Sequence, residues 1–351
     1  MLRQVPAYRL YMNKRILQVK EMEDKVVIHC SDNTEYDCDI LVGADGAYSA
    51  TRQNIQKEMD AVGLLPKSDK ENLVAASLCM VGSTGPLDPE KYPVLKDSFV
   101  QHRSVQGGNR QGWNVYNIPG NRMCWAYVVG FEDPEEAKRQ QFANSEWGPE
   151  SIEPMIKQIY DKPCPYGGKM GDLIDATERS MISKVFLEHK HFETWFYKRT
   201  VLIGDACHKM LPSAGLGAVC AMQDAVILAN CLYDLKSNSQ EDVTVAFQSY
   251  YDQRYPQTKL AYDASMARAK LMKGQRWHEK LTRHVIFNYV PDSVMEAKAA
   301  KSQMYRPQAS FLPTVPFRGT APVLPLIPSE RYKREQAAKR ASQQVQAAIS
   351  V

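Results

Sequence analysis

The sequence lacks several features that mark whole classes of protein. It has no apolar run of about eighteen residues, the minimum for a membrane-spanning helix, and its N-terminus lacks the pattern of a signal peptide. It also has no excess of charge of one sign, because 44 Lys and Arg face 40 Asp and Glu, for a formal net charge of +4. Such a balance argues against a nucleic-acid-binding surface. These absences predict a soluble, intracellular, cytoplasmic protein and argue against membrane association.

Two kinds of cysteine and histidine site are also missing. The sequence has eight cysteines but no pair spaced as C-x-x-C, and several of them lie inside apolar runs, as reduced core thiols do. This pattern favours a reducing compartment. His189-Lys190-His191 has Glu193 nearby but no further His or Cys at ligand spacing. We therefore interpret these histidines as part of a solvated loop and predict no metal site.

The sequence does contain enough apolar residues for a large core, since 44% of its 351 residues are hydrophobic and two domains are expected. Helices are predicted at 48–59, at 145–160 starting from Pro149, and at 242–273, where Pro256 should kink or break the helix. The region from Met304 is rich in proline, which predicts an extended strap or linker and not a domain. Residues 330–351 predict a frayed helix or a disordered tail.

Short apolar or alternating segments predict several β-strands. They lie at residues 15–19, 26–30, around Tyr36, at 73–81, at 113–118 and at 123–129. The last two form the clearest hairpin, whose return strand places four side chains on one face: Met123, Trp125, Tyr127 and Val129. These side chains could line a pocket, although core packing is the more common role of aromatic residues on a sheet.

The stretch from Arg199 to Leu235 has the most informative order of features. Residues 200–203 predict a buried parallel strand, which ends at Gly204-Asp205. A loop broken by Pro212 follows, then Gly215-Leu216-Gly217-Ala218, then a long helical pattern. The helix is expected to bury the face made of Ala218, Met222, Ala225, Val226, Ala229 and Leu232.

This order suits a ligand that has both hydroxyl groups and a flat ring. An acid at the carboxyl end of a parallel strand faces the crevice where open α/β sheets bind ligands, so Asp205 could accept hydrogen bonds from a polyol. Gly215 and Gly217 allow a ring to approach the backbone, and the N–H groups at the helix start favour negative charge. A flavin meets both requirements. A dinucleotide fingerprint at these glycines is the weaker alternative, because it lies about ten residues past the strand.

A second stretch repeats the order of strand, glycine and acid. Residues 39–52 predict another apolar strand, followed by the pattern Gly43-x-Asp45-Gly46-x-x-Ser49-x-x-Arg52. The later stretch has Gly204-Asp205-Ala206-x-His208 and then Pro212, Gly215, Gly217 and Asp224-Ala225. The pair resembles the D-G and G-D motifs of the flavin-dependent aromatic hydroxylases, which share the fold of para-hydroxybenzoate hydroxylase. His208-Lys209-Met210 is most similar to the fungal paxM-type FAD-dependent monooxygenases, and the resemblance covers roughly residues 1–260.

The resemblance implies an α/β fold with a Rossmann-like FAD-binding domain and an antiparallel-sheet substrate domain. Residues 1–60 would hold the D-G part of the FAD-binding domain, 61–195 the substrate domain, 196–275 the G-D part, and 276–351 a C-terminal helix, strap and tail. Members of the class begin further upstream, with a strand, a G-x-G-x-x-G turn and a helix that bind the FAD pyrophosphate. We find no such unit before Gly43 and expect an N-terminally truncated copy, without the N-terminal βαβ unit, that retains little FAD.

By resemblance, FAD is the cofactor and NAD(P)H the co-substrate. Asp205, after Gly204, would bind the ribityl chain. The segment from Pro212 to Ala218, with Gly215 and Gly217, would lie beneath the ring. Cys220 stands where many relatives have Asn, so contacts in the first helical turn can differ.

The D-G motif would lie at the other end of the cofactor. Asp45, Gly46 and Arg52 are expected near the pyrophosphate and the approach of the nicotinamide. We predict no catalytic side chain, because the flavin itself performs the oxygen chemistry. His208 is better explained as a structural hydrogen-bonding residue than as a base.

Three functions follow from the resemblance. The first is a monooxygenase of secondary metabolism that hydroxylates or epoxidises an apolar or aromatic small molecule. The second is a non-catalytic remnant without the pyrophosphate site, and the third is a flavin dehydrogenase or reductase of the same fold. Halogenation is disfavoured, because residues 114–119 lack both tryptophans of the halogenase W-x-W-x-I-P pattern. The sequence leaves the substrate, the choice between NADH and NADPH, and the oligomeric state open.

Overall fold

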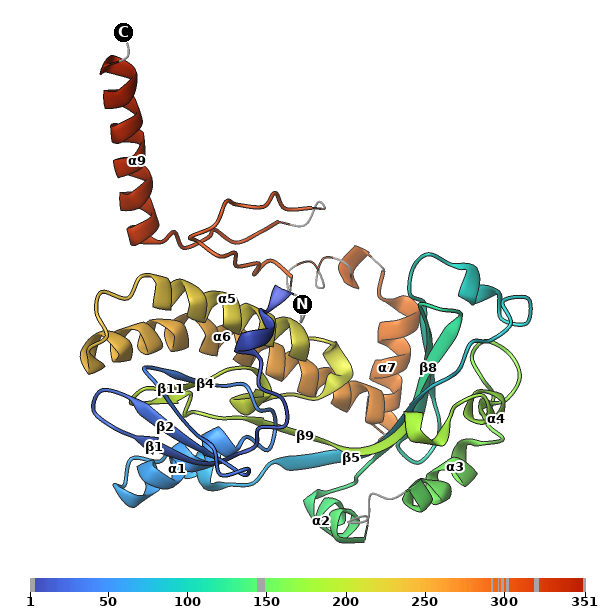
Figure 1. The fold of residues 1–351 in the computed structure, drawn as a ribbon. Helices are drawn as coiled ribbons and strands as arrows, with labels where there is room; N and C mark the ends of the chain where they lie inside the picture. The colour runs from blue at the N-terminus through green and yellow to red at the C-terminus, as the bar shows by residue number, and fades with distance from the viewer. Residues whose placement is uncertain are drawn as a thin grey trace. The chain divides into compact units, whose positions relative to one another are not determined.

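The computed structural model describes residues 4–143, 149–274, 276–291, 293–295, 297, 300, 303–318 and 322–349. The chain divides into two compact units, and Figure 1 labels many of their helices and strands. Unit 1 consists of Met1–Asn72, Lys190–Ser265 and Pro291–Val351, and unit 2 of Leu73–His189 and Met266–Val290. Each unit buries a hydrophobic core of its own. A membrane-crossing helix would need a longer apolar stretch than any helix in the described part of the chain has.

The centre of unit 1 is a small sheet with one parallel pair of strands. β4 (Leu41–Gly43) lies parallel to β11 (Thr200–Leu202), and β11 also pairs antiparallel with β10 (Phe196–Tyr197). All three residues of β11 are buried, which confirms the buried parallel strand predicted there. Because the two strands of the parallel pair run in the same direction, the loops after Gly43 and Leu202 leave the same edge of the sheet.

An antiparallel meander precedes β4 in the chain. β1 (Ile16–Glu21), β2 (Val26–Cys30) and β3 (Glu35–Cys38) pair in chain order, as the sequence predicts. Residues of β1, β2 and β4 share a small hydrophobic core. Helix α1 (Ala50–Ala61) follows β4, and it begins and ends two residues later than the helix predicted at 48–59.

Two long helices complete the core of unit 1. α5 (Gly217–Tyr233) and α6 (Gln240–Lys273) follow β11 in the chain, and the last turns of α6 belong to unit 2. The single helix predicted at 242–273 is confirmed. Pro256 lies inside α6 and does not end it.

The buried face of α5 differs from the predicted one. Ala218, Met222 and Ala225 are exposed, and the residues that pack inward are Cys220, Asp224, Ile227, Leu228 and Cys231. α5 is apolar on almost every side, so three-and-four spacing fits more than one face of the helix. The face that packs inward is the one that places an acid, Asp224, in the interior.

The solvated loop predicted for His189-Lys190-His191 is wrong. These residues end β9 (Ile182–His191), and the last two of them pair with β12 (His208–Lys209). The side chain of Lys190 is buried, and its ammonium group donates to the backbone carbonyls of Ser68, at 2.7 Å, and Glu71. A charged residue can lie in this strand because the carbonyl groups replace its hydration.

The proline-rich segment, residues 304–329, is called the strap; its described part has no helix or strand, and it folds back on itself, because Leu324 N donates to Met304 O at 2.9 Å. Gln223 Nε2 of α5 donates to Tyr305 O at 2.8 Å. Asn230 of α5 donates to Gln308 O at 3.0 Å and accepts from Ser310 N at 2.8 Å. The strap therefore binds α5 through its own backbone, and it leads into helix α9 (Glu330–Ile349).

Unit 2 is built on an antiparallel sheet in the order β9-β5-β8-β7-β6. Besides β9, its strands are β5 (Val74–Ser83), β6 (His102–Gln106), β7 (Gln111–Ile118) and β8 (Arg122–Gly130). The strand predicted at 73–81 and the hairpin of β7 and β8 are thus confirmed.

Besides the sheet, unit 2 contains the helices α2 (Pro134–Ala143), α3 (Glu153–Ile159), α4 (Met170–Asp175) and α7 (Trp277–Tyr289). The helix predicted from Pro149 begins as a 3-10 turn at Pro149–Ile152 and continues as α3. Residues 145–148 of that prediction lie outside the described residues.

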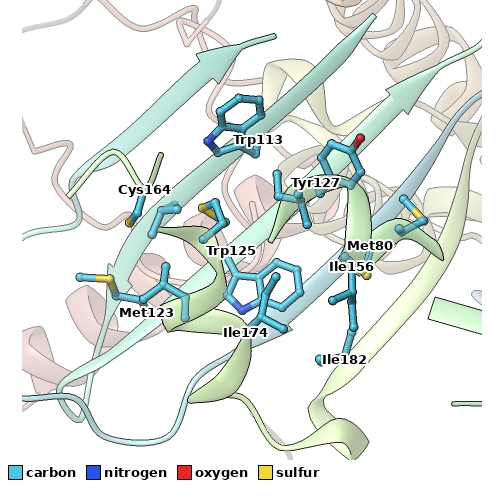
Figure 2. Close-up of a cluster of buried hydrophobic side chains, with 14 of the residues drawn as sticks. Met80, Trp113, Met123, Trp125, Tyr127, Ile156, Cys164, Ile174 and Ile182 are labelled. Carbon is cyan, nitrogen blue, oxygen red and sulfur yellow. The ribbon is translucent and has the colours of Figure 1, made fainter. Parts of the chain in front are cut away.

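One face of the sheet packs against α3 and α4 and forms the core of unit 2, shown in Figure 2. Met123, Trp125 and Tyr127 of β8 are fully buried in this core. The indole N–H of Trp125 donates to Thr177 Oγ1 at 3.0 Å. Trp125 and Tyr127 of the return strand are therefore core residues.

Candidate functional site

Both sequence motifs lie at the carboxyl edge of the parallel strand pair. Leu202 pairs with Gly43, and Ile203 N donates to Gly43 O at 3.0 Å. A Cβ atom at position 43 would lie 2.7 Å from atoms of Leu202 and Thr51. Glycine is required here because α1 packs so closely against the sheet. The loops that contain Asp45 and Asp205 consequently begin side by side.

Asp45 fixes the start of α1. Its carboxylate accepts hydrogen bonds from Ser49 Oγ at 2.5 Å, Thr51 N at 3.0 Å and Thr51 Oγ1 at 3.1 Å. Ser49 is the N-cap of the helix, and its hydroxyl accepts from Arg52 N at 2.9 Å. Gly46, between them, has a φ of +80°. The D-G motif therefore forms a rigid, capped turn, and direct contact of Asp45 or Gly46 with a cofactor stays a prediction.

Arg52 joins the two motif loops. Its side chain is buried, with 5% of the residue exposed, and its guanidinium donates to Ala206 O and Ala47 O at 2.8 Å each. The same group lies 4.2 Å from the ring centre of Phe192, in cation–π geometry. Burial lowers the pKa of Arg52 from its ordinary value. These contacts make Arg52 a clamp between the D-G and G-D loops, and the predicted contact with the pyrophosphate or nicotinamide remains a prediction.

The G-D motif forms a 3-10 turn, Gly204–Ala206, after β11. Gly204 has a φ of +62°, and a Cβ added there would lie 3.0 Å from Ala221 Cβ on α5, so both backbone conformation and packing require glycine. Asp205 is half-buried, and its carboxylate accepts a hydrogen bond from Lys209 Nζ at 2.6 Å. A polyol bound to Asp205 would share the carboxylate with this lysine.

The start of α5 is open to a ligand. Pro212–Ala214 forms another 3-10 turn, which ends at Gly215 with a φ of +68°. The N-cap position of α5 is Leu216, which has no side-chain acceptor, so the first-turn N–H groups lack a cap. Gly215 and Ala218 are exposed, and no atom lies within 4 Å of a Cβ placed at Gly215. An uncapped, glycine-lined helix start fits the electron-rich edge of a flavin ring.

A buried ion pair lies behind these loops. Asp224, His208 and Arg254 have side chains with 0% exposure. Asp224 accepts from His208 Nε2 at 2.5 Å, from Arg254 Nε at 2.8 Å and from Gly204 N at 2.9 Å. Burial alone would raise the pKa of Asp224, but the hydrogen bond from His208 and the charge of Arg254 outweigh it and lower that pKa.

Cys207, His208 and Asp224 offer ligand atoms within 4.8 Å of one another, which is close enough for a metal ion. Two observations disfavour that interpretation. Arg254 already neutralises Asp224, and burial raises the pKa of the Cys207 thiol well above its ordinary value, so the thiolate that binds metals is disfavoured. The cluster is better suited to hydrogen bonding than to metal binding.

The structure thus brings the predicted residues Gly204 and Asp205 next to the D-G loop, through Arg52, and places Gly215, Gly217 and Ala218 at one helix start. Sequence reasoning missed the role of Asp224 and the whole contribution of Arg254. A signal for the first was present, because an acid within an apolar helical pattern needs a buried partner. The local pattern does not show that this partner is Arg254, which lies 30 residues further along the chain.

Comparisons with known proteins give matches to flavin-dependent enzymes. Residues 166–265 match a family model described as an FAD binding domain. The FAD-dependent monooxygenase ausM of Emericella nidulans is 25% identical over 320 residues, which are 87% of this chain and 62% of that protein. The ausM protein of Penicillium brasilianum is 27% identical over 313 residues, 86% of this chain and 62% of that protein. The chain therefore spans less than two thirds of the length of these curated relatives.

Solved structures show the same fold. HpxO of Klebsiella pneumoniae, complexed with FAD and uric acid, superposes with a TM-score of 0.62 at 18% identity, over 83% of this chain and 66% of that chain. 2,6-Dihydroxypyridine-3-hydroxylase from Arthrobacter nicotinovorans gives a TM-score of 0.58 at 17% identity, over 78% and 68%. The chain is thus similar in sequence to FAD-dependent monooxygenases and has the mixed α/β fold of these solved structures, as the motif resemblance predicts.

Proposed function

We propose that the chain acts in an FAD-dependent monooxygenase that uses NAD(P)H and O2 to hydroxylate or epoxidise an apolar or aromatic small molecule. The main support is the meeting of the D-G and G-D loops at one edge of the parallel strand pair, clamped by Arg52. The uncapped, exposed start of α5 follows the G-D loop in the chain. FAD, when bound, supplies the redox chemistry and the activation of oxygen.

The residues of this chain would bind and orient the riboflavin half of FAD. Asp205, half-exposed beside Lys209, is placed to accept hydrogen bonds from ribityl hydroxyls. The first-turn amides of α5, at Gly217 and Ala218, would face partial negative charge on the pyrimidine edge of the ring. Arg52 would act indirectly, by holding the loops in place.

The second face of the unit 2 sheet is the surface that we assign to the substrate. Its side chains alternate with those of the core face, and Asn114, Tyr116, Cys124 and Ala126 are only partly buried. Tyr116 stacks on His102 with ring centres 5.8 Å apart. A mainly apolar surface with one aromatic pair and one amide suits an apolar or aromatic substrate.

The remaining parts of the proposal concern partners and location. The HpxO structure holds uric acid, which is a small molecule, and we propose a small-molecule substrate here too, with no nucleic-acid or membrane partner. We also propose an intracellular, cytoplasmic location. All eight cysteines lie in the described part of the chain and are free thiols, which supports a reducing compartment.

The test is a binding experiment that separates the two halves of FAD. The purified 351-residue chain is titrated into FAD, FMN and riboflavin, and quenching of flavin fluorescence is measured, with ADP as competitor. We expect riboflavin to bind and to compete with FAD, and ADP to compete poorly, because the described site offers contacts to the ring and ribityl chain. Absence of binding by riboflavin, FMN and FAD would contradict the proposal. Oxygen consumption coupled to NADPH oxidation then separates a monooxygenase from a dehydrogenase.

A further inference from the structure

The buried carboxylate of Asp224 ties together three separate parts of unit 1. Its oxygens accept from the backbone N–H of Gly204, from the ring of His208 and from the guanidinium of Arg254. Gly204 and His208 lie on either side of Asp205 in the chain. One carboxylate therefore fixes both ends of the short segment that contains Asp205.

The same carboxylate also fixes the start of α5. Arg254 Nη2 donates to the carbonyl of Cys220, in the first turn of α5, at 3.2 Å. Tyr305 of the strap also contacts the guanidinium, with its ring centre 5.2 Å from Arg254 Cζ. The pair Asp224–Arg254 thus holds segment 204–208 and the first turn of α5 in a fixed position relative to each other.

The arrangement of hydrogen bonds points to positioning and not to charge. The tautomer of His208 with its proton on Nε2 donates to Asp224, and the buried Nδ1, which has no partner among the described residues, is then an acceptor and leaves no donor unpaired. Trp195 packs against this ring, with centres 5.2 Å apart. Asp224 and Arg254 cancel each other's charge, so the cluster offers no net charge to a ligand.

A buried ion pair is not needed for stability, because apolar residues of similar volume often replace such pairs without loss. The Asp224–Arg254 pair behind the motif loops is therefore expected to have a role other than stability. We propose that Asp224, with His208 and Arg254, is a positioning residue that sets Asp205 and the start of α5 in the register that a flavin requires, without contacting the flavin. This inference rests on the proposed function.

The decisive variant removes both charges together. In Asp224→Leu/Arg254→Met, no uncompensated charge is left in the core, so the chain should still fold, while the two donors that lose their acceptor, Gly204 N and His208 Nε2, should lower the thermal unfolding temperature moderately. The amide of Gly204 loses its acceptor, so hydrogen exchange of peptides within residues 203–212 should become about tenfold faster or more, and riboflavin affinity should fall by a similar factor. Asp234→Asn is the matched control, because Asp234 ends the same helix but bonds to Ser329 of the strap, and it should change neither the exchange nor the affinity.

A second pair of variants decides the matter if the double variant does not fold. His208→Gln keeps an N–H donor for Asp224 and should behave as the wild type, whereas His208→Leu should speed exchange in the same peptides. Unchanged exchange in the double variant, or equal exchange in the Gln and Leu variants, would overturn the positioning role. The exchange measurement needs no flavin. If the wild-type chain fails to bind riboflavin, the proposed function is refuted, but the exchange rates still decide whether Asp224 positions the loop.

Discussion

The clamp formed by Arg52 makes a prediction that distinguishes it from a direct cofactor contact. Arg52→Met keeps an unbranched chain over Phe192 but removes the two donors to Ala206 O and Ala47 O. Each charge-assisted hydrogen bond is worth about 1.5–3 kcal/mol, and the cation–π contact about 0.5–2 kcal/mol. The substitution also relieves the cost of burying a cation, which offsets part of this loss. We expect a net loss of about 2–4 kcal/mol in the stability of unit 1.

The assay is hydrogen exchange of the amides of β11, which reports the opening of unit 1, and of β8, which reports the opening of unit 2. Arg103→Met is the matched control, because Arg103 also stacks on an aromatic ring, that of Tyr166 at 4.6 Å, and also donates to one carbonyl, but is exposed. It should cost about 1 kcal/mol or less in the stability of unit 2. Equal losses in the two variants would refute the clamp.

Flavin binding by the Arg52→Met variant tests the role of Arg52 independently. If Arg52 holds the loops, Arg52→Met weakens riboflavin, FMN and FAD to a similar degree. If Arg52 instead contacts the phosphates, riboflavin binds normally and the affinity for FMN or FAD falls alone. The ratio of the three affinities, measured by fluorescence quenching, therefore decides between the two roles.

Three further predictions concern single side chains. Asp205→Ala should weaken flavin binding by about 1.5–3 kcal/mol, and unchanged affinity would remove this acid from the site. Ala218→Leu should displace the ring from the exposed start of α5, so normal affinity and turnover would show that no flavin lies there. Burial, followed by the nearby His208, lowers the pKa of His191 from 6.5 to about 4. The unfolded state therefore takes up the proton first, so unfolding free energy should fall as the pH drops from 6.5 to about 4; thermal unfolding of His191→Phe should show a flatter pH dependence.

The parts of the fold that the sequence predicts well are those with one dominant pattern. The β7–β8 hairpin alternates cleanly because one face meets a core, and β11 is buried throughout because it is central in its sheet. The glycine–acid motifs are also local, since each turn depends on adjacent residues such as Gly204 and Asp205.

The parts that the sequence predicts poorly depend on distant partners. The sequence does not predict the inward face of α5 correctly, because the helix is apolar on most sides. The face that packs inward is the one whose acid, Asp224, pairs with Arg254 of another helix. The sequence predicts a solvated loop at the end of β9, because a lysine such as Lys190 usually faces solvent. In the structure its ammonium group donates to the backbone carbonyls of Ser68 and Glu71. In both cases a buried charge is paired with a group far away in the chain, which no local period reveals.

The strap has a consequence for how the two sides of its contact can evolve. To Gln223 and Asn230 of α5 the strap offers only backbone groups of Tyr305, Gln308 and Ser310, which every residue provides except for the missing N–H of proline. On α5, by contrast, the bonds come from the amide side chains of Gln223 and Asn230. In this contact Gln308 and Ser310 should therefore tolerate substitution as long as Ser310 does not become proline, whereas Tyr305 also packs on Arg254 through its ring. A single change at Asn230 removes two bonds at once, so in this contact selection should act more strongly on the helix than on Gln308 and Ser310 of the strap.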